Sequence, residues 1–196
     1  LAGAVPALLG MLQFYVAWDR LDYRTAAAIQ YPDDAPLREW HDVWPTPAMA
    51  KWVTDLAAPA TQDDCTAMAV RLRLLACDLL ANGERRIRDR QFEDAMLRAY
   101  RVLELIGQGR LFGHGLDSAS VPPDHAAVQA LDRKLAKKGS AGFGKNRDGT
   151  LTAGRELVAR LLKELRDALA KTLLSFDNQP QLPRIRARNV SVLIHG

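Results

Sequence analysis

The last fourteen residues, Pro183 to Gly196, hold the side chains with the clearest chemical potential in this sequence. Pro183 suits the first turn of a helix, in which successive residues are rotated by about 100°. One narrow stripe of that helix would then hold Arg184, Arg188, Ser191 and His195. The spacing therefore predicts a polar, basic helix face, with apolar residues beside it for docking.

Arg188 and His195 are the two residues of that stripe that could act on a phosphodiester. An imidazole titrates near neutral pH and can move protons, and a guanidinium offers a planar donor fork to phosphate oxygens. RNA supplies its own nucleophile, the 2′-hydroxyl, so this pair suffices for metal-free RNA cleavage. DNA, which lacks that hydroxyl, would be inert.

The spacing leaves a second interpretation of the same pair open. Arg188 could bond a nearby acid while His195 only ends the helix. The two residues are about 10 Å apart along the axis, so both tips reach one phosphate only if they lean inward or a second chain contributes. A two-fold dimer would bring two such pairs together.

Further basic residues lie in the middle of the chain. Arg85 and Arg86 could contact RNA phosphates, since each neutralised phosphate strengthens binding. A neighbouring set, Asp94, Arg98, Arg101 and Glu104, has the three- and four-residue spacing that favours a solvated, ion-paired helix face over an RNA contact.

The segment from Gly139 to Asn146 nearly spells a phosphate-binding P-loop. Its last position is Asn where a Ser or Thr hydroxyl is needed, and a helix rather than a buried strand is expected before it. We therefore predict a mobile, Gly-rich basic loop over 139–149, in which Lys145 could touch RNA.

Composition sets the class of protein. The chain has 196 residues, 48% of them hydrophobic, and a net charge of +4, which excludes a disordered chain and is too weak to indicate a nucleic-acid binder by itself. Residues 1–64 carry four basic and nine acidic side chains, so the positive surplus lies in the remainder. Cys65 and Cys77 lie about 18 Å apart in one predicted helix, too far for a disulfide. No metal-ligand spacing surrounds the histidines.

Hydrophobic periodicity predicts an all-α fold. The opening apolar run is too short and too interrupted to span a membrane and is interpreted as a core helix. Helices are expected over about 5–30, from a loose capping box of Thr61 and Asp64 through Gly83 to Arg90, and over 92–111, 124–138, 150–177 and 183–195. A Pro- and Trp-rich loop over 31–47 and the Gly-rich loop interrupt them.

Three segments resemble one known family. Arg188-Asn189, five further residues and His195 fit the Arg-polar-x4-6-His signature of HEPN ribonucleases. The ending Ala187 to Gly196 is similar to the RN-x-S-x-L-x-HG ending of CARF-HEPN proteins of type III CRISPR systems. Asn82 to Glu104 and Trp18 to Tyr23 are similar to two more elements of that family, with Gly83 where alanine is usual.

The resemblance implies a function and a site. It implies a metal-independent endoribonuclease that needs no cofactor, acts on single-stranded RNA and works as a homodimer sharing Arg and His between protomers. Arg188 and His195 would be catalytic, with Asn189 and Ser191 as orienting neighbours. The remaining candidates for RNA contact are Arg184, Arg85, Arg86 and Lys145.

The resemblance also implies a larger context. In that family an N-terminal CARF domain senses cyclic oligoadenylate and activates the nuclease in antiviral defence. Because Leu1 is not Met and no strands alternate with helices, we expect residues 1–196 to be a single HEPN-type domain, the C-terminal effector part, without its sensor. It would be cytoplasmic. The alternatives are a non-catalytic RNA-binding or dimerisation module, and a HEPN toxin of a toxin-antitoxin pair.

Overall fold

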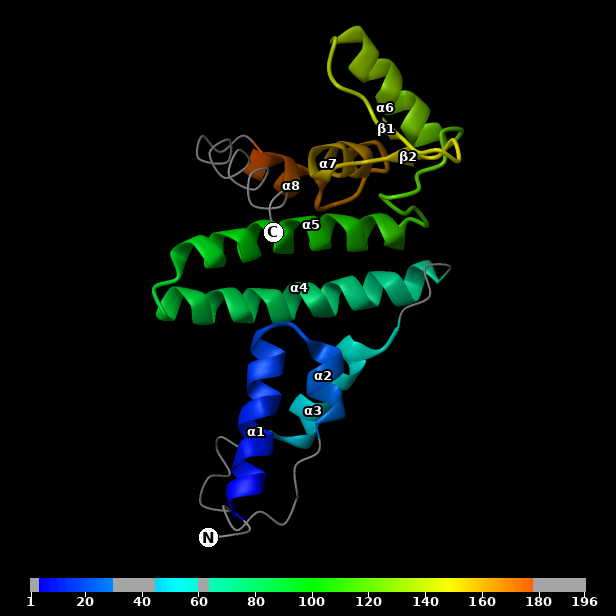
Figure 1. Ribbon diagram of the computed structural model, residues 1–196. Coiled ribbons are helices and arrows are strands. Elements are labelled where there is room, and N and C mark those ends of the chain that lie inside the picture. Colours follow the sequence, from blue (N-terminus) through cyan, green and yellow to red (C-terminus); the bar gives the residue numbers. More distant parts are fainter. Residues whose placement is uncertain (1–3, 30–44, 60–63, 178–196) are drawn as a thin grey trace. The chain divides into compact units, whose positions relative to one another are not determined.

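The computed structural model describes residues 4–29, 45–59 and 64–177 (Figure 1). The chain divides into two compact units, residues 1–59 and residues 60–196. Each unit is described by itself. That the two units together act as one domain stays a prediction.

The first unit is built from three helices. These are α1 (Ala4–Asp19), α2 (Tyr23–Ala28) and α3 (Pro47–Ala57). Phe14, Ala26 and Val53, one from each helix, are almost fully buried and form the centre of a small core. The Trp18 ring packs edge-on against Phe14, with 5.6 Å between the ring centroids. Aromatic packing thus holds this unit together.

The predicted single helix over 5–30 is wrong, because the chain turns between α1 and α2. Leu21 has a φ of 64°, in the left-handed region, which ends α1. The Asp22 side chain then accepts a hydrogen bond from the backbone N–H of Thr25 and starts α2. The turn lies within the Trp18 to Tyr23 segment.

The prediction that the opening run is a core helix is confirmed for one face of α1 only. Ala7, Met11 and Phe14 are buried. On the other side a stripe of apolar side chains is about half exposed or more: Val5, Leu9, Leu12 and Val16.

Helix α3 is a finding that the sequence interpretation did not contain. Thr46 accepts a hydrogen bond from the backbone N–H of Met49, and Pro47 occupies the first turn, so the cap and the proline together set the start of the helix. Most of the predicted Pro- and Trp-rich loop, residues 30–44, lies outside the described residues.

The second unit begins with a long helical hairpin. Helix α4 (Cys65–Arg88) and helix α5 (Phe92–Gly113) run antiparallel, side by side (Figure 1). Asp64 caps α4 by accepting a hydrogen bond from the N–H of Ala67. The helix continues through Gly83, as predicted, and the chain reverses at Arg90, where φ is 60°.

Three shorter helices complete the second unit. These are α6 (Ala126–Lys137), α7 (Arg155–Glu164) and α8 (Ala170–Asp177). The predicted continuous helix over 150–177 is wrong, since Arg166 has a φ of 58° and separates α7 from α8. Asp167 accepts the N–H of Leu169 and supports the start of α8. The predicted helix over 183–195 lies outside the described residues.

The Gly-rich segment is a hydrogen-bonded hairpin rather than the predicted mobile loop. Strand β1 (Gly144–Lys145) pairs antiparallel with β2 (Leu151–Thr152). The Asn146 side chain donates to the carbonyl oxygen of Ala119 at 2.8 Å and to the hydroxyl of Thr150 at 2.8 Å. Because a strand, not a helix, contains Lys145, the rejection of a P-loop is confirmed.

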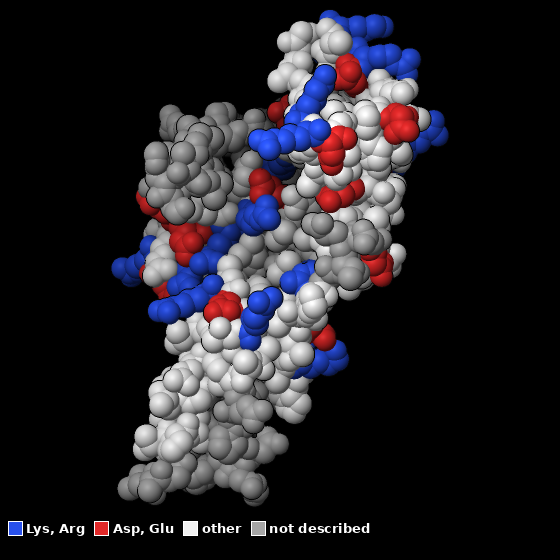
Figure 2. Space-filling model, turned by 45° about the vertical axis from the view of Figure 1, so that its right-hand side comes forward, with Lys and Arg blue, Asp and Glu red and all other residues white. Residues whose placement is uncertain are grey.

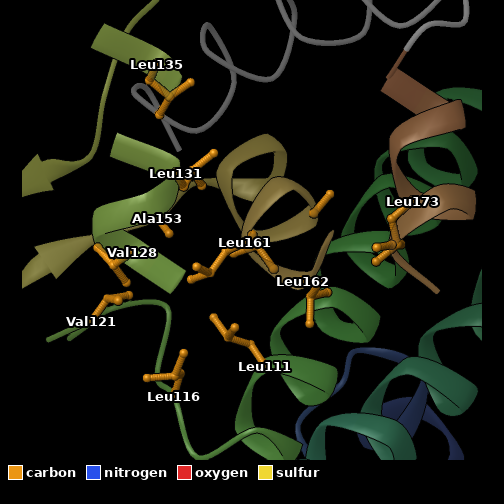
Figure 3. Close-up of a cluster of buried hydrophobic side chains, with 13 residues drawn as sticks. Leu111, Leu116, Val121, Val128, Leu131, Leu135, Ala153, Leu161, Leu162 and Leu173 are labelled. Carbon is orange, nitrogen blue, oxygen red and sulfur yellow. The ribbon is translucent and has the colours of Figure 1, made fainter. Parts of the chain in front are cut away.

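The main core lies in the second unit, between α5 and the shorter helices (Figure 3). Leu111, Leu161 and Leu162 are fully buried there, and Val121 and Val128 close it from the α6 side. The charged side chains visible in Figure 2 gather on this unit, whereas α1 is mostly white. The described part of the chain has eight helices and one hairpin of two strands, each two residues long, so the all-α prediction is confirmed.

Candidate functional site

The predicted catalytic stripe lies outside the described residues. This applies to Arg184, Arg188, Asn189, Ser191 and His195. Their proposed roles therefore stay predictions. The described part of the chain ends at Asp177, the last residue of α8. The segment that holds the predicted stripe, residues 178–196, follows it in the chain.

Arg86 is built into the junction between α4 and α5. Its Nε lies 3.3 Å from Oδ2 of Asp94, and its Nη1 donates to Oε1 of Gln91 at 3.1 Å. Arg98 donates to the same Asp94 oxygen, at 2.9 Å from Nη2 and 3.2 Å from Nε. Both arginine side chains are only 15% exposed. The fold thus already uses Arg86 to hold the hairpin.

Asp94 is thus shared between two guanidiniums, those of Arg86 and Arg98. Arg85, which precedes Arg86 in the chain, is half-buried. The predicted ion pairs of α5 are confirmed, since Arg98 pairs with Asp94 and Arg101 Nη1 lies 2.7 Å from Glu104 Oε2. The prediction that this whole face is solvated is wrong at Arg98, whose side chain packs at the junction with α4.

Lys145 stands on a different element, the β1–β2 hairpin. Its side chain is exposed and its backbone pairs with Leu151. Arg85 and Arg86 thus belong to one helix, while Lys145 belongs to a hairpin that lies between α6 and α7 in the chain. The hairpin presents Lys145 to solvent, which keeps it available for an anion.

A cluster that the sequence interpretation missed joins α5 to the turn before α8. The carboxylate of Asp167 is fully buried, and its Oδ2 accepts hydrogen bonds from Arg110 Nη2 at 2.7 Å and Nε at 3.0 Å. His114 Nε2 lies 2.9 Å from the same oxygen. The other carboxylate oxygen accepts the N–H of Leu169.

Two opposing effects set the pKa of Asp167. Burial acts to raise this pKa, because it disfavours the charged form. Hydrogen bonds from Arg110, His114 and the Leu169 N–H act in the other direction, and the pKa ends below its ordinary value. Asp167 is therefore ionised, and its hydrogen bonds connect the end of α5 to the turn that leads into α8.

Sequence spacing could have found half of this cluster. Arg110 and His114 are four residues apart, which places them on one face near the end of α5. Asp167 is more than fifty residues further on. It lies in a turn that the sequence does not indicate, because the apolar periodicity continues across it.

The second unit thus consists of a long helical hairpin, shorter helices packed against α5, and helix α8, which precedes the segment with Arg188 and His195 in the chain. The family model described as "Csm6 HEPN domain" matches residues 66–196. The chain belongs to this family. No curated protein and no solved structure matches the chain.

The match to the Csm6 HEPN domain covers the helices of the second unit and the terminal segment, while α1 to α3 precede it. The resemblance noted in the sequence is thereby confirmed for a CRISPR-associated HEPN domain of ribonuclease type. No helix among the described residues has the length and apolar character needed to cross a membrane.

Proposed function

We propose that this Csm6 HEPN-family chain is a metal-independent endoribonuclease that cleaves single-stranded RNA by attack of the RNA's own 2′-hydroxyl. The observation that carries the proposal is the family match over 66–196, which includes the Arg188 and His195 pair at the HEPN spacing. The basic surplus on the same part of the chain supports an RNA substrate.

The proposed step balances without a cofactor. The 2′-oxygen forms a bond to phosphorus, the bond from phosphorus to the 5′-oxygen breaks, and the 2′-hydroxyl proton leaves while the 5′-oxygen gains one. His195 carries protons between these oxygens. Arg188 donates to the phosphate oxygens as charge develops on them. Asn189 and Ser191 orient the pair.

We assign the active form to a homodimer. In a helix, Arg188 and His195 stand about 10 Å apart along the axis, so a second copy related by two-fold symmetry completes the site. The exposed apolar stripe on α1 leaves surface that a partner could cover. We further assign activation to a cyclic-oligoadenylate sensor domain, as in type III CRISPR antiviral defence, and the site of action to the cytoplasm.

The test is RNA cleavage in the presence of EDTA by the activated protein and by two variants of it, His195→Ala and Arg188→Ala. Each variant should lose cleavage by roughly 10²-fold or more while keeping the helical circular dichroism of the parent. His125→Asn is the matched control, because it also removes a histidine. Asparagine can still cap α6, where His125 Nδ1 accepts the N–H of Ala127.

Unchanged cleavage in His195→Ala, or activity only with added metal, would contradict the mechanism. Binding of RNA without any cleavage by the activated protein would favour the non-catalytic module instead.

A further inference from the structure

A cavity of about 360 Å³ lies among α6, α7 and α8. This size falls within the range of ligand sites, which is about 300 to 1,000 Å³. Its apolar lining comes from Leu131, Leu135 and Leu174. Its charged lining consists of Lys134, Lys138, Glu156, Arg160, Lys163 and Glu164. We call this cavity the α6–α7 groove.

Two of the four cations in the α6–α7 groove are neutralised by carboxylates. Lys134 Nζ lies 2.6 Å from Glu164 Oε2, which ties α6 to α7. Arg160 Nη2 lies 2.6 Å from Glu156 Oε1, within α7. These pairs fix the groove walls and leave its net charge positive.

Lys138 and Lys163 supply that surplus charge. Both side chains are exposed, and within residues 4–29, 45–59 and 64–177 neither has a carboxylate at ion-pair distance. Lys138 follows the last residue of α6, and Lys163 lies in the last turn of α7, where the helix dipole favours a cation. Both ammonium groups therefore lie at the groove with N–H donors that could bind an anion.

We infer that the α6–α7 groove binds the sugar-phosphate backbone of single-stranded RNA. The surplus ammonium groups fit phosphates, and the leucine side chains offer an apolar surface beside them for the sugar rings. The groove opens to solvent through exposed lysines, which suits a strand passing through. This inference rests on the proposed function for the identity of the polymer.

The chain connects this groove to the proposed catalytic pair. Leu174 belongs to α8, the last described helix before the terminal segment. Ten residues separate Asn178 from Arg188, and a chain of that length reaches at most about 35 Å. A strand held in the groove can therefore extend by a few nucleotides to the cleavage site.

The test measures binding of a fluorescent 2′-O-methyl RNA strand by anisotropy over a range of salt concentrations. This probe lacks the free 2′-hydroxyl, so binding is read apart from cleavage. The test variant is Lys138→Ala/Lys163→Ala. The matched control is Lys137→Ala/Lys171→Ala, which removes two exposed lysines of α6 and α8 that do not line the groove.

We expect the test variant to bind more weakly and to lower the slope of log affinity against log salt by about 1.4, since each phosphate contact to a single strand adds about 0.7. The control should keep the parent slope. Equal slopes in the two variants would overturn the inference. So would displacement of the strand by a mononucleotide at the same phosphate concentration, which would assign the groove to a free nucleotide.

Failure of the proposed function gives a different pattern. If the activated protein does not cleave natural RNA, but Lys138→Ala/Lys163→Ala still lowers the salt slope relative to the control variant, the inference about the groove is kept and the ribonuclease proposal is rejected.

Discussion

Arg110 donates two hydrogen bonds to one buried oxygen of Asp167, at 2.7 and 3.0 Å, across 57 residues of sequence. This contact fastens the end of α5 to the turn from which α8 starts. The terminal segment that carries Arg188 and His195 follows α8 directly. The contact therefore lies at the base of the proposed catalytic segment.

Asp167→Asn should lower the free energy of unfolding by about 1.5–3 kcal/mol, because it removes charge-assisted hydrogen bonds from a buried acceptor. Chemical denaturation measures this loss. Asp132→Asn, on the exposed surface of α6, is the control and should change stability by less than about 0.5 kcal/mol. An equal effect of both substitutions would show that the cluster contributes little.

The lowered pKa of Asp167 predicts a pH dependence of stability. A carboxyl whose pKa is lower in the folded state stabilises the fold above its unfolded pKa, about 3.9. This contribution is lost as the pH falls through the folded pKa. The stability difference between the parent and Asp167→Asn should therefore be full near pH 6 and shrink below about pH 4. A constant difference over this range would argue against an ionised Asp167.

Gly83→Ala should raise stability by about 0.5–1 kcal/mol, because alanine favours a helix more than glycine does. The added Cβ would lie 3.6 Å from the Cβ of Arg98, which is ordinary contact. Gly107→Ala is the matched comparison, since its Cβ would meet Cγ1 of Val158 at 3.2 Å. The midpoint of thermal unfolding should rise for Gly83→Ala. For Gly107→Ala it should rise less or fall.

Mixing Arg188→Ala chains with His195→Ala chains should restore part of the cleavage that each variant lacks alone. A site shared by two protomers keeps one arginine and one histidine in the mixed dimer. If the site lay within one chain, every chain in the mixture would lack either Arg188 or His195, and cleavage would not be restored. The measurement is RNA cleavage by co-expressed variants, with each variant alone as the control.

The long helices were predictable from the sequence because their apolar periodicity is strong. This holds for α4, α5 and α6. The expected capping box begins at Thr61, which lies outside the described residues, whereas the side chain of Asp64 caps α4. The breaks at Leu21 and Arg166 were not predictable. Both are ordinary helix-forming residues held at positive φ, and the apolar pattern runs through them without a signal.

Sequence spacing points to candidate site residues only where they are close in the chain. Arg188 and His195 share one short segment within the family match, and their catalytic role stays a prediction. The bond from Arg110 to Asp167 and the α6–α7 groove join residues that are far apart in the chain. Which lysines share a groove depends on how α6 packs on α7, and this is fixed by the core rather than by local spacing.

The chemical form of the cleaved ends tests the central proposal most directly. The activated protein is incubated in EDTA with one single-stranded RNA and, separately, with the all-deoxy strand of the same sequence. The masses of the products are then determined by mass spectrometry. We expect 2′,3′-cyclic phosphate and 5′-hydroxyl ends from the RNA and no product from the DNA. Cleavage of the all-deoxy strand, or 5′-phosphate ends from the RNA, would contradict it.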